Sequence, residues 1–115
     1  MRGKRAVITG IGVVSPIGAG AEEFWRALTA GESGIGPITL FDTTGFAVQI
    51  GGEIKDLDFS EYIPAELSRK MSRNSKLAVV ASRLAQADSG LEITEENNGQ
   101  VDVFMGVACP DLDTL

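Results

Sequence analysis

The chain has 115 residues, of which 43% are apolar, and its 16 acidic and 10 basic residues give a net charge of −6. This composition predicts a globular chain that can bury a core, and the excess of acids argues against nonspecific binding to nucleic acid, which needs a positive face. The sequence has no apolar run of about 20 residues, no signal-peptide pattern, no histidine and a single cysteine, Cys109, so we expect a cytoplasmic protein with no membrane span, no internal disulfide and no Cys/His metal site.

The first predicted element is a strand–turn–helix corner. A β-branched run at residues 6–9 leads into closely spaced glycines, and a helical pattern of about ten residues follows Gly20 and stops at Gly31. Glycines permit positive φ or a close approach of the backbone, and Pro16 fixes its own φ while removing one N–H donor. This corner is therefore predicted to have a defined shape and to form part of a site.

One interpretation of the corner is the phosphate-binding loop of a small nucleotide-binding domain. Gly10-Ile11-Gly12 matches the opening of the dinucleotide fingerprint, but Ser15 replaces its third glycine. Glu22 and Glu23 in the first helical turn would repel a phosphate. Asp42, the nearest candidate for the ribose-binding acid, comes about ten residues later than the usual spacing of roughly 20 residues. These features argue against this alternative.

The middle of the chain is predicted to be a surface excursion followed by two helices. Glycines divide residues 32–59 into short extended pieces such as residues 47–50, with Phe41 and Phe46 as packing anchors. A helical region from Ser60 is interrupted near Pro64. The strongest helix follows a cap at Ser72 or Asn74, ends at Gly90 and carries one apolar stripe, formed by Leu77, Val80, Ala81, Leu84 and Ala85.

The last predicted element is a strand at residues 101–107, after a polar and turn-rich stretch at residues 92–100. Strands at both ends with helices between them indicate an α/β layer with parallel strands and a right-handed crossover. The sequence shows no internal repeat and no low-complexity tract that would separate domains.

Six sequence segments together resemble the start of the β-ketoacyl-acyl-carrier-protein synthases, in the order of that family. They are VITGIGVVSPIG (residues 7–18), FW (24–25), GESGI (31–35), FD (41–42), RKM (69–71) and DSGLEITEEN (88–97). The resemblance implies the N-terminal part of a thiolase-like αβαβα half, α/β with a mostly parallel sheet and covering helices. Residues 1–115 are then expected to be an incomplete domain of a longer protein.

The resemblance also implies an acyltransferase activity for that longer protein. Members of the family condense a malonyl-carrier protein with an acyl thioester, with loss of carbon dioxide, in fatty acid or polyketide biosynthesis. They act as homodimers, without a cofactor. Their catalytic cysteine and two histidines are expected beyond residue 115, so no catalytic residue is assigned here and this chain alone is expected to be inactive.

A cluster of bases stands out in the acidic chain, at Arg69, Lys70, Arg73 and Lys76. On one helix, residues 69, 73 and 76 would share a face and present positive charge to an acidic partner. The resemblance implies that Arg69, Lys70 and Arg73 dock the acyl carrier protein, although Glu66 interrupts a stretch that is often more basic in the family. The alternative is a solvated helix face paired with nearby acids.

The loop at residues 106–111 departs from the glycine-rich sequence that the family has after this strand. The resemblance implies that Ala108 and Cys109 line the acyl pocket, and a changed loop keeps open a noncatalytic ketosynthase-like partner of the chain-length-factor type. Cys109 itself is predicted to act sterically rather than as a nucleophile, because Pro110 and Asp111 supply neither a helix N-terminus nor a cation to activate its thiol.

Overall fold

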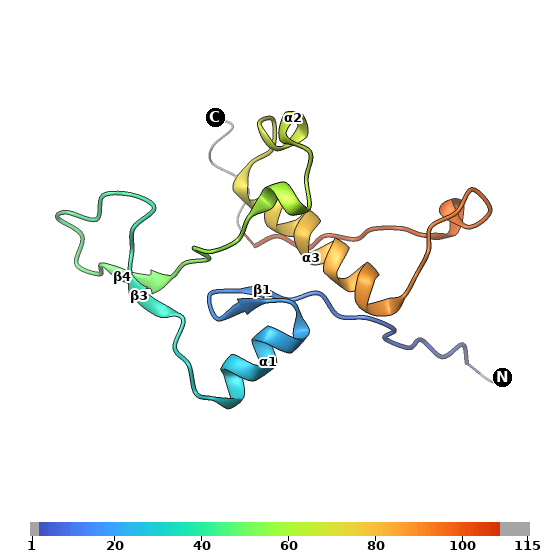
Figure 1. Ribbon diagram of the computed structural model, residues 1–115, viewed down its shortest axis with the longest axis horizontal. Helices are drawn as coiled ribbons and strands as arrows, with labels where there is room; N and C mark the ends of the chain where they lie inside the picture. The colour runs from blue at the N-terminus through green and yellow to red at the C-terminus, as the bar shows by residue number, and fades with distance from the viewer. Residues whose placement is uncertain (1–2, 109–115) are drawn as a thin grey trace.

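The computed structural model describes residues 3–108, which form short helices and two small sheets around one long helix (Figure 1). The elements in chain order are β1 (Val14–Ser15), β2 (Gly18–Ala19), α1 (Ala21–Thr29), β3 (Ile35–Pro37), β4 (Ile50–Gly52), the 3₁₀ helix η1 (Phe59–Glu61), α2 (Ala65–Ser68), α3 (Arg73–Ser89) and the 3₁₀ helix η2 (Asn98–Gln100). The predicted order of a first helix, a surface excursion, an interrupted helix and a long helix is confirmed.

Helix α1 begins where the sequence predicts, directly after Gly20. The carboxylate of Glu23 in its first turn accepts a hydrogen bond of 2.9 Å from the backbone N–H of Ala19, which holds the end of β2 against the helix. Ala27 is fully buried. The helix ends at Thr29 with Ala30 as its C-terminal cap, and Gly31 follows in a left-handed conformation with φ 71°.

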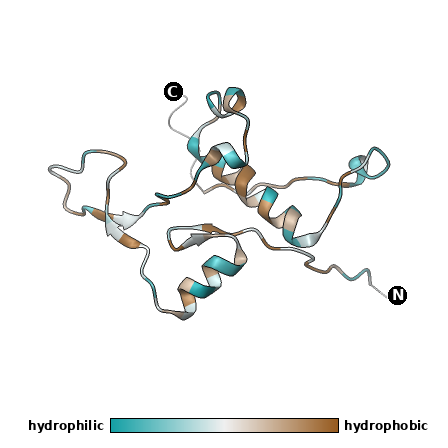
Figure 2. Cartoon of the chain, viewed as in Figure 1, coloured by the Kyte–Doolittle hydropathy of each residue, from teal (hydrophilic) through white to brown (hydrophobic). Residues whose placement is uncertain are grey.

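Helix α3 has all three of its predicted features. The Ser72 hydroxyl caps its N-terminus by accepting a hydrogen bond of 3.2 Å from the N–H of Ser75. Gly90 ends it in a left-handed conformation, with φ 65° and ψ 15°. Val80 in the predicted apolar stripe is fully buried, and Figure 2 shows hydrophobic and hydrophilic residues interspersed along the helix. Each of these signals is local, which is why the sequence alone predicts this helix.

Both sheets are antiparallel pairs of short strands. In the first, Val14 pairs with Ala19 across a tight turn at Pro16. In the second, Ile35 of β3 pairs with Gly52 of β4. The excursion at residues 32–59 therefore contains a strand pair, and its second strand lies at residues 50–52 rather than at the predicted 47–50.

The predicted terminal strands do not form in this structure. Residues 6–9 and 101–107 are assigned to no strand, and no parallel sheet is present within residues 3–108. A strand is defined by hydrogen bonds to a neighbour, and neither segment has a partner strand in this part of the chain. Their apolar side chains are accordingly exposed, Ile8 by 86% and Phe104 by 92%.

The described chain is open rather than tightly packed. Its radius of gyration is 17.3 Å, whereas a compact domain of this length has about 13 Å. The buried apolar side chains within residues 3–108 are those of Ala27, Ile63 and Val80. No helix in this region combines the length and the apolar character needed to cross a membrane.

Candidate functional site

The glycines of the N-terminal corner allow its backbone to lie directly on α3. A Cβ atom on Gly12 would overlap the carbonyl oxygen of Ala81 and would lie 2.6 Å from the amide nitrogen of Ala85. A Cβ on Gly10 would lie 2.5 Å from the amide nitrogen of Ser89. Any side chain larger than hydrogen would force the segment away from the helix. The Gly-x-Gly pattern therefore serves close packing against α3.

Two backbone donors of this corner are occupied by carboxylates of the same chain. The N–H of Ile11 donates a hydrogen bond of 2.8 Å to Oδ2 of Asp88, and the N–H of Ala19 donates to Glu23. A bound phosphate would need these donors and would meet two negative side chains beside them. The geometry thus does not fit the dinucleotide loop, and the contact between Asp88 and this corner was not predicted from the sequence.

The basic cluster is divided between two elements. Arg69 is the C-terminal cap of the short helix α2, whereas Arg73 is the first residue of α3. The prediction that residues 69, 73 and 76 share one helical face is therefore wrong, because the cap at Ser72 starts a new helix between them. Both Arg69 and Lys70 are exposed, and neither side chain makes a hydrogen bond or ion pair with the rest of residues 3–108.

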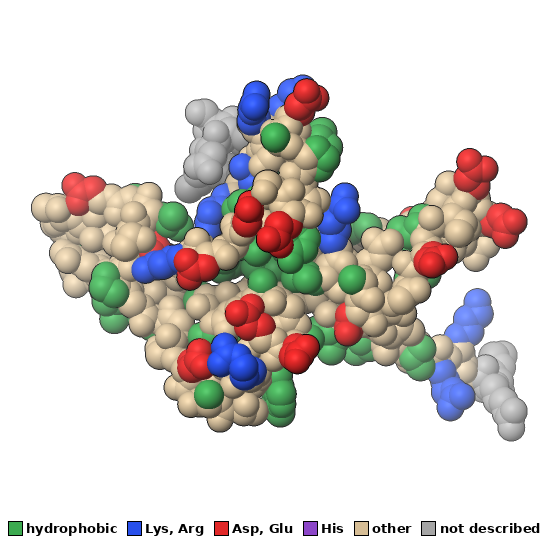
Figure 3. Space-filling model, in the orientation of Figure 1, with side chains coloured by type: hydrophobic (Ala, Val, Ile, Leu, Met, Phe, Trp, Pro, Cys, Tyr) green, Lys and Arg blue, Asp and Glu red, His purple; other side chains and the backbone are tan. Residues whose placement is uncertain are grey.

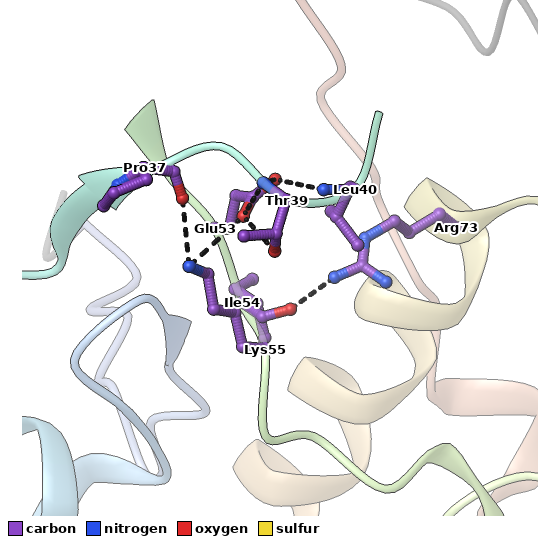
Figure 4. Close-up of polar contacts among 7 residues, drawn as sticks. All are labelled: Pro37, Thr39, Leu40, Glu53, Ile54, Lys55 and Arg73. Carbon is purple, nitrogen blue, oxygen red and sulfur yellow. Dashed lines mark hydrogen bonds and ion pairs between the residues drawn. The ribbon is translucent and has the colours of Figure 1, made fainter. Parts of the chain in front are cut away.

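The other two bases face the chain itself. The guanidinium carbon of Arg73 lies 5.8 Å from the centre of the Phe59 ring, and Nζ of Lys76 lies 5.7 Å from the same centre. Arg73 also donates a hydrogen bond of 2.5 Å from Nη2 to the carbonyl oxygen of Ile54 (Figure 4). These contacts are cation–π and charge-assisted interactions that hold residues 54–59 against the start of α3.

Basic side chains gather at the tip of the projection that carries α2, where an acidic side chain lies close by (Figure 3). The exposed charged residues of this projection include Arg69, Lys70 and Glu66. The structure thus separates an outward pair, Arg69 and Lys70, from an inward pair, Arg73 and Lys76. The outward pair can contact a partner directly, whereas the inward pair already contacts Phe59.

A second polar centre, at Glu53, was not predicted. Its carboxylate accepts hydrogen bonds of 2.9–3.0 Å from the N–H and hydroxyl of Thr39 and from the N–H of Leu40, and it lies 3.4 Å from Nζ of Lys55 (Figure 4). Burial raises the pKa of this carboxyl, but the hydrogen bonds from Leu40, Thr39 and Lys55 together outweigh it and lower the pKa from 4.5 to about 2. Glu53 therefore stays ionised and fastens the base of the β3–β4 loop.

A family model described as the N-terminal domain of beta-ketoacyl synthases matches residues 4–114. The chain belongs to this family. Among its relatives, 3-oxoacyl-[acyl-carrier-protein] synthase 2 of Vibrio harveyi is 42% identical over the whole chain, and that of Coxiella burnetii is 43% identical over 92% of it. The tetracenomycin polyketide synthase ketoacyl synthase beta subunit of Streptomyces glaucescens is 44% identical over 75% of the chain.

The β-ketoacyl synthase fold is also found by structural comparison. A solved structure of the ishigamide ketosynthase/chain length factor matches 79% of this chain with a TM-score of 0.67 and 41% identity. The chain spans only part of these proteins, namely 28% of the Vibrio relative, 26% of the Coxiella relative, 21% of the Streptomyces relative and 22% of the solved chain. The resemblance read from the sequence motifs is therefore confirmed at the level of family and fold.

The predicted acyl-pocket residues of this β-ketoacyl synthase segment stay predictions. Ala108 is exposed at the end of the described residues, and Cys109 lies outside them. No group of three or more Cys, Asp or Glu side chains within residues 3–108 is arranged to hold a metal ion. What this part of the chain offers chemically is a pair of exposed bases, Arg69 and Lys70, directly after the short helix α2.

Proposed function

We propose that residues 1–115 form the N-terminal segment of a cytoplasmic, homodimeric β-ketoacyl-acyl-carrier-protein synthase that works without a cofactor. The longer protein joins a malonyl-carrier protein to an acyl thioester with loss of carbon dioxide, in fatty acid or polyketide biosynthesis. Support comes from family membership and from relatives named 3-oxoacyl-[acyl-carrier-protein] synthase 2. The sequence of residues 1–115 contains no histidine, so the two histidines of the reaction would come from elsewhere in that protein.

The role that we assign to this segment is docking of the acyl carrier protein through Arg69 and Lys70. The single observation that carries it is the exposed pair of bases at the tip of the α2 projection, free of ion pairs within residues 3–108, in a chain with net charge −6. Complementary charge between this tip and an acidic carrier would speed encounter and favour one orientation. Arg73, predicted from sequence to share this role, contributes indirectly because it already bonds Ile54.

Charge reversal in the full-length protein tests the docking role. Arg69→Glu combined with Lys70→Glu should raise the KM for an acyl-carrier-protein substrate by about tenfold at low salt, with a small thioester substrate unaffected. The difference between wild type and variant should shrink as ionic strength rises, because exposed charges are screened. An equal loss with both substrates would mean damaged folding, and an unchanged carrier KM would refute docking at these bases.

A noncatalytic partner of the chain-length-factor type is the second candidate. It is favoured by the similarity to a polyketide ketoacyl synthase beta subunit and to a solved ketosynthase/chain length factor. The two candidates differ in covalent chemistry, because only a catalytic subunit takes the acyl group from the carrier thiol onto one of its own cysteines. Mass spectrometry of the full-length protein after incubation with an acyl carrier thioester separates them: an acyl-cysteine adduct selects the enzyme, and its absence selects the partner.

A further inference from the structure

The projection that carries α2 is a closed loop whose two ends meet at one aromatic ring. Phe59 begins η1 before α2, and Arg73 and Lys76 lie in the first turns of α3 after it. Both cations lie within 6 Å of the Phe59 ring centre, at 5.8 and 5.7 Å. The ring therefore joins the two ends of the segment at residues 60–72, which stands out from α3 in Figure 1.

Contacts of residues within this loop and at its end also stabilise it. The N–H of Ile63 donates a hydrogen bond of 2.8 Å to the carbonyl oxygen of Phe59, and the Ile63 side chain is one of the few buried apolar groups of the described chain, with 3% exposure. Arg73 ties the same end of α3 to Ile54. The exposed bases Arg69 and Lys70 lie three to four residues before Arg73, so the ring fixes the corner from which they project.

The Phe59 ring also decides which bases are free. Four cations within eight residues repel one another, and a π face attracts the two that can reach it. With Arg73 and Lys76 held on the ring, positive charge at the tip is left to Arg69 and Lys70. Without the ring, the closure of residues 60–72 would be weaker, because it would rest on the hydrogen bond from Arg73 to Ile54 and on the buried Ile63, and a carrier protein would have to order the loop further on binding.

We propose that Phe59 is a positioning residue that presents Arg69 and Lys70 to the acyl carrier protein, an inference that rests on the docking function proposed above. The ring touches neither carrier nor substrate. It acts through Arg73 and Lys76, by closing the loop and by keeping these two cations off the docking tip. Loss of the aromatic face should therefore weaken use of the carrier and leave the chemical step unchanged.

Steady-state kinetics of the full-length protein test this role. Phe59→Leu keeps an apolar side chain and removes the π face, so the KM for the acyl-carrier-protein substrate should rise by about threefold to tenfold while kcat and the KM for a small thioester stay at wild-type values. Phe59→Tyr keeps the ring and should restore the wild-type carrier KM. Phe46→Leu is the matched control, because the Phe46 ring contacts the ring of Phe41 rather than a cation.

A double-mutant cycle separates the positioning role from docking itself. In a protein that already carries Arg69→Glu and Lys70→Glu, Phe59→Leu should change the carrier KM by less than about twofold, because the ring acts through those bases. An effect of Phe59→Leu that persists in full in that background, an equal loss with both substrates, or a failure of Phe59→Tyr to rescue would overturn the positioning role. An effective charge reversal with a silent Phe59→Leu would refute positioning alone, whereas a silent charge reversal would refute docking and positioning together.

Discussion

Replacing Gly12 by alanine measures how closely the N-terminal corner is packed on α3. The added methyl group would overlap the carbonyl oxygen of Ala81 and lie 2.6 Å from the amide nitrogen of Ala85, whereas non-bonded carbon contacts are normally about 3.5–4.0 Å. The segment must therefore withdraw by about 1 Å, which forfeits a quarter to a half of the dispersion energy along the contact. Forced overpacking costs about 1–3 kcal/mol, and we expect about 3 kcal/mol because both obstacles are backbone atoms of a helix.

Urea denaturation of the full-length protein gives the free energy of unfolding for this test. A loss of 3 kcal/mol is a large part of a typical stability of about 5–15 kcal/mol. Gly36→Ala is the matched control, since a Cβ on Gly36 meets no atom within 4 Å and should change stability by at most about 1 kcal/mol. Equal stability of the two variants would refute the packing argument. Calorimetry with NAD⁺ adds a second test, because micromolar binding lost in Gly12→Ala would restore the dinucleotide interpretation.

Three further predictions test other parts of the structure. Glu53→Gln should lower the urea midpoint at pH 7. Because the folded pKa of Glu53 is depressed to about 2, its carboxylate stabilises the fold only while it is ionised. The difference in urea midpoint between wild type and variant should therefore diminish as the pH falls from 4.5 towards 2. Glu22→Gln, at an exposed position, is its control and should leave the urea midpoint at pH 7 close to that of the wild type. Arg73→Ala should lower the free energy of unfolding by about 1–2 kcal/mol, because it loses the contacts to Ile54 and Phe59. Arg69→Ala should change the free energy of unfolding by no more than about 0.5 kcal/mol. Urea denaturation of both variants measures the difference. Cys109→Ala should leave acyl-enzyme formation intact and Cys109→Phe should shift the preference towards shorter acyl chains; an acyl group mapped by mass spectrometry to Cys109 itself would contradict the steric role.

The features that the sequence predicted correctly depend on a few neighbouring residues. Ser72 can cap α3 because its hydroxyl reaches the N–H three residues later, and Gly90 can end it because glycine adopts positive φ without strain. The same cap explains the error in the basic cluster. A new helix that starts after Ser72 leaves Arg69 on the preceding element, so a single helical face through residues 69–76 and a cap at Ser72 exclude each other.

The features that the sequence missed join residues far apart in the chain. Glu53 meets Thr39 across 14 residues, and Asp88 meets the amide of Ile11 across 77 residues. Nothing in the local pattern distinguishes Glu53 from the other acids, because its low pKa comes from donors brought to it by the β3–β4 pair. Phe59 is a similar case: the sequence shows an aromatic residue and a basic cluster, and the fold puts the two in contact.

The two extended end segments account for both the open shape and the missing parallel sheet. Both contribute to one groove on α3, whose lining includes Thr9 and Gly10 of the first segment and Val101 and Val103 of the second. With α3 between them in sequence, a parallel pairing of these segments would be a right-handed strand–helix–strand unit. Burying side chains such as Ile8 and Phe104 in such a sheet would contribute about 1.5–3 kcal/mol each, which is large against a total stability of about 5–15 kcal/mol. The apolar pattern of these segments and the exposure of their side chains thus have one cause. Both segments suit a larger sheet, and residues 3–108 do not contain its remaining strands. This supports the proposal that the chain is one part of a larger synthase.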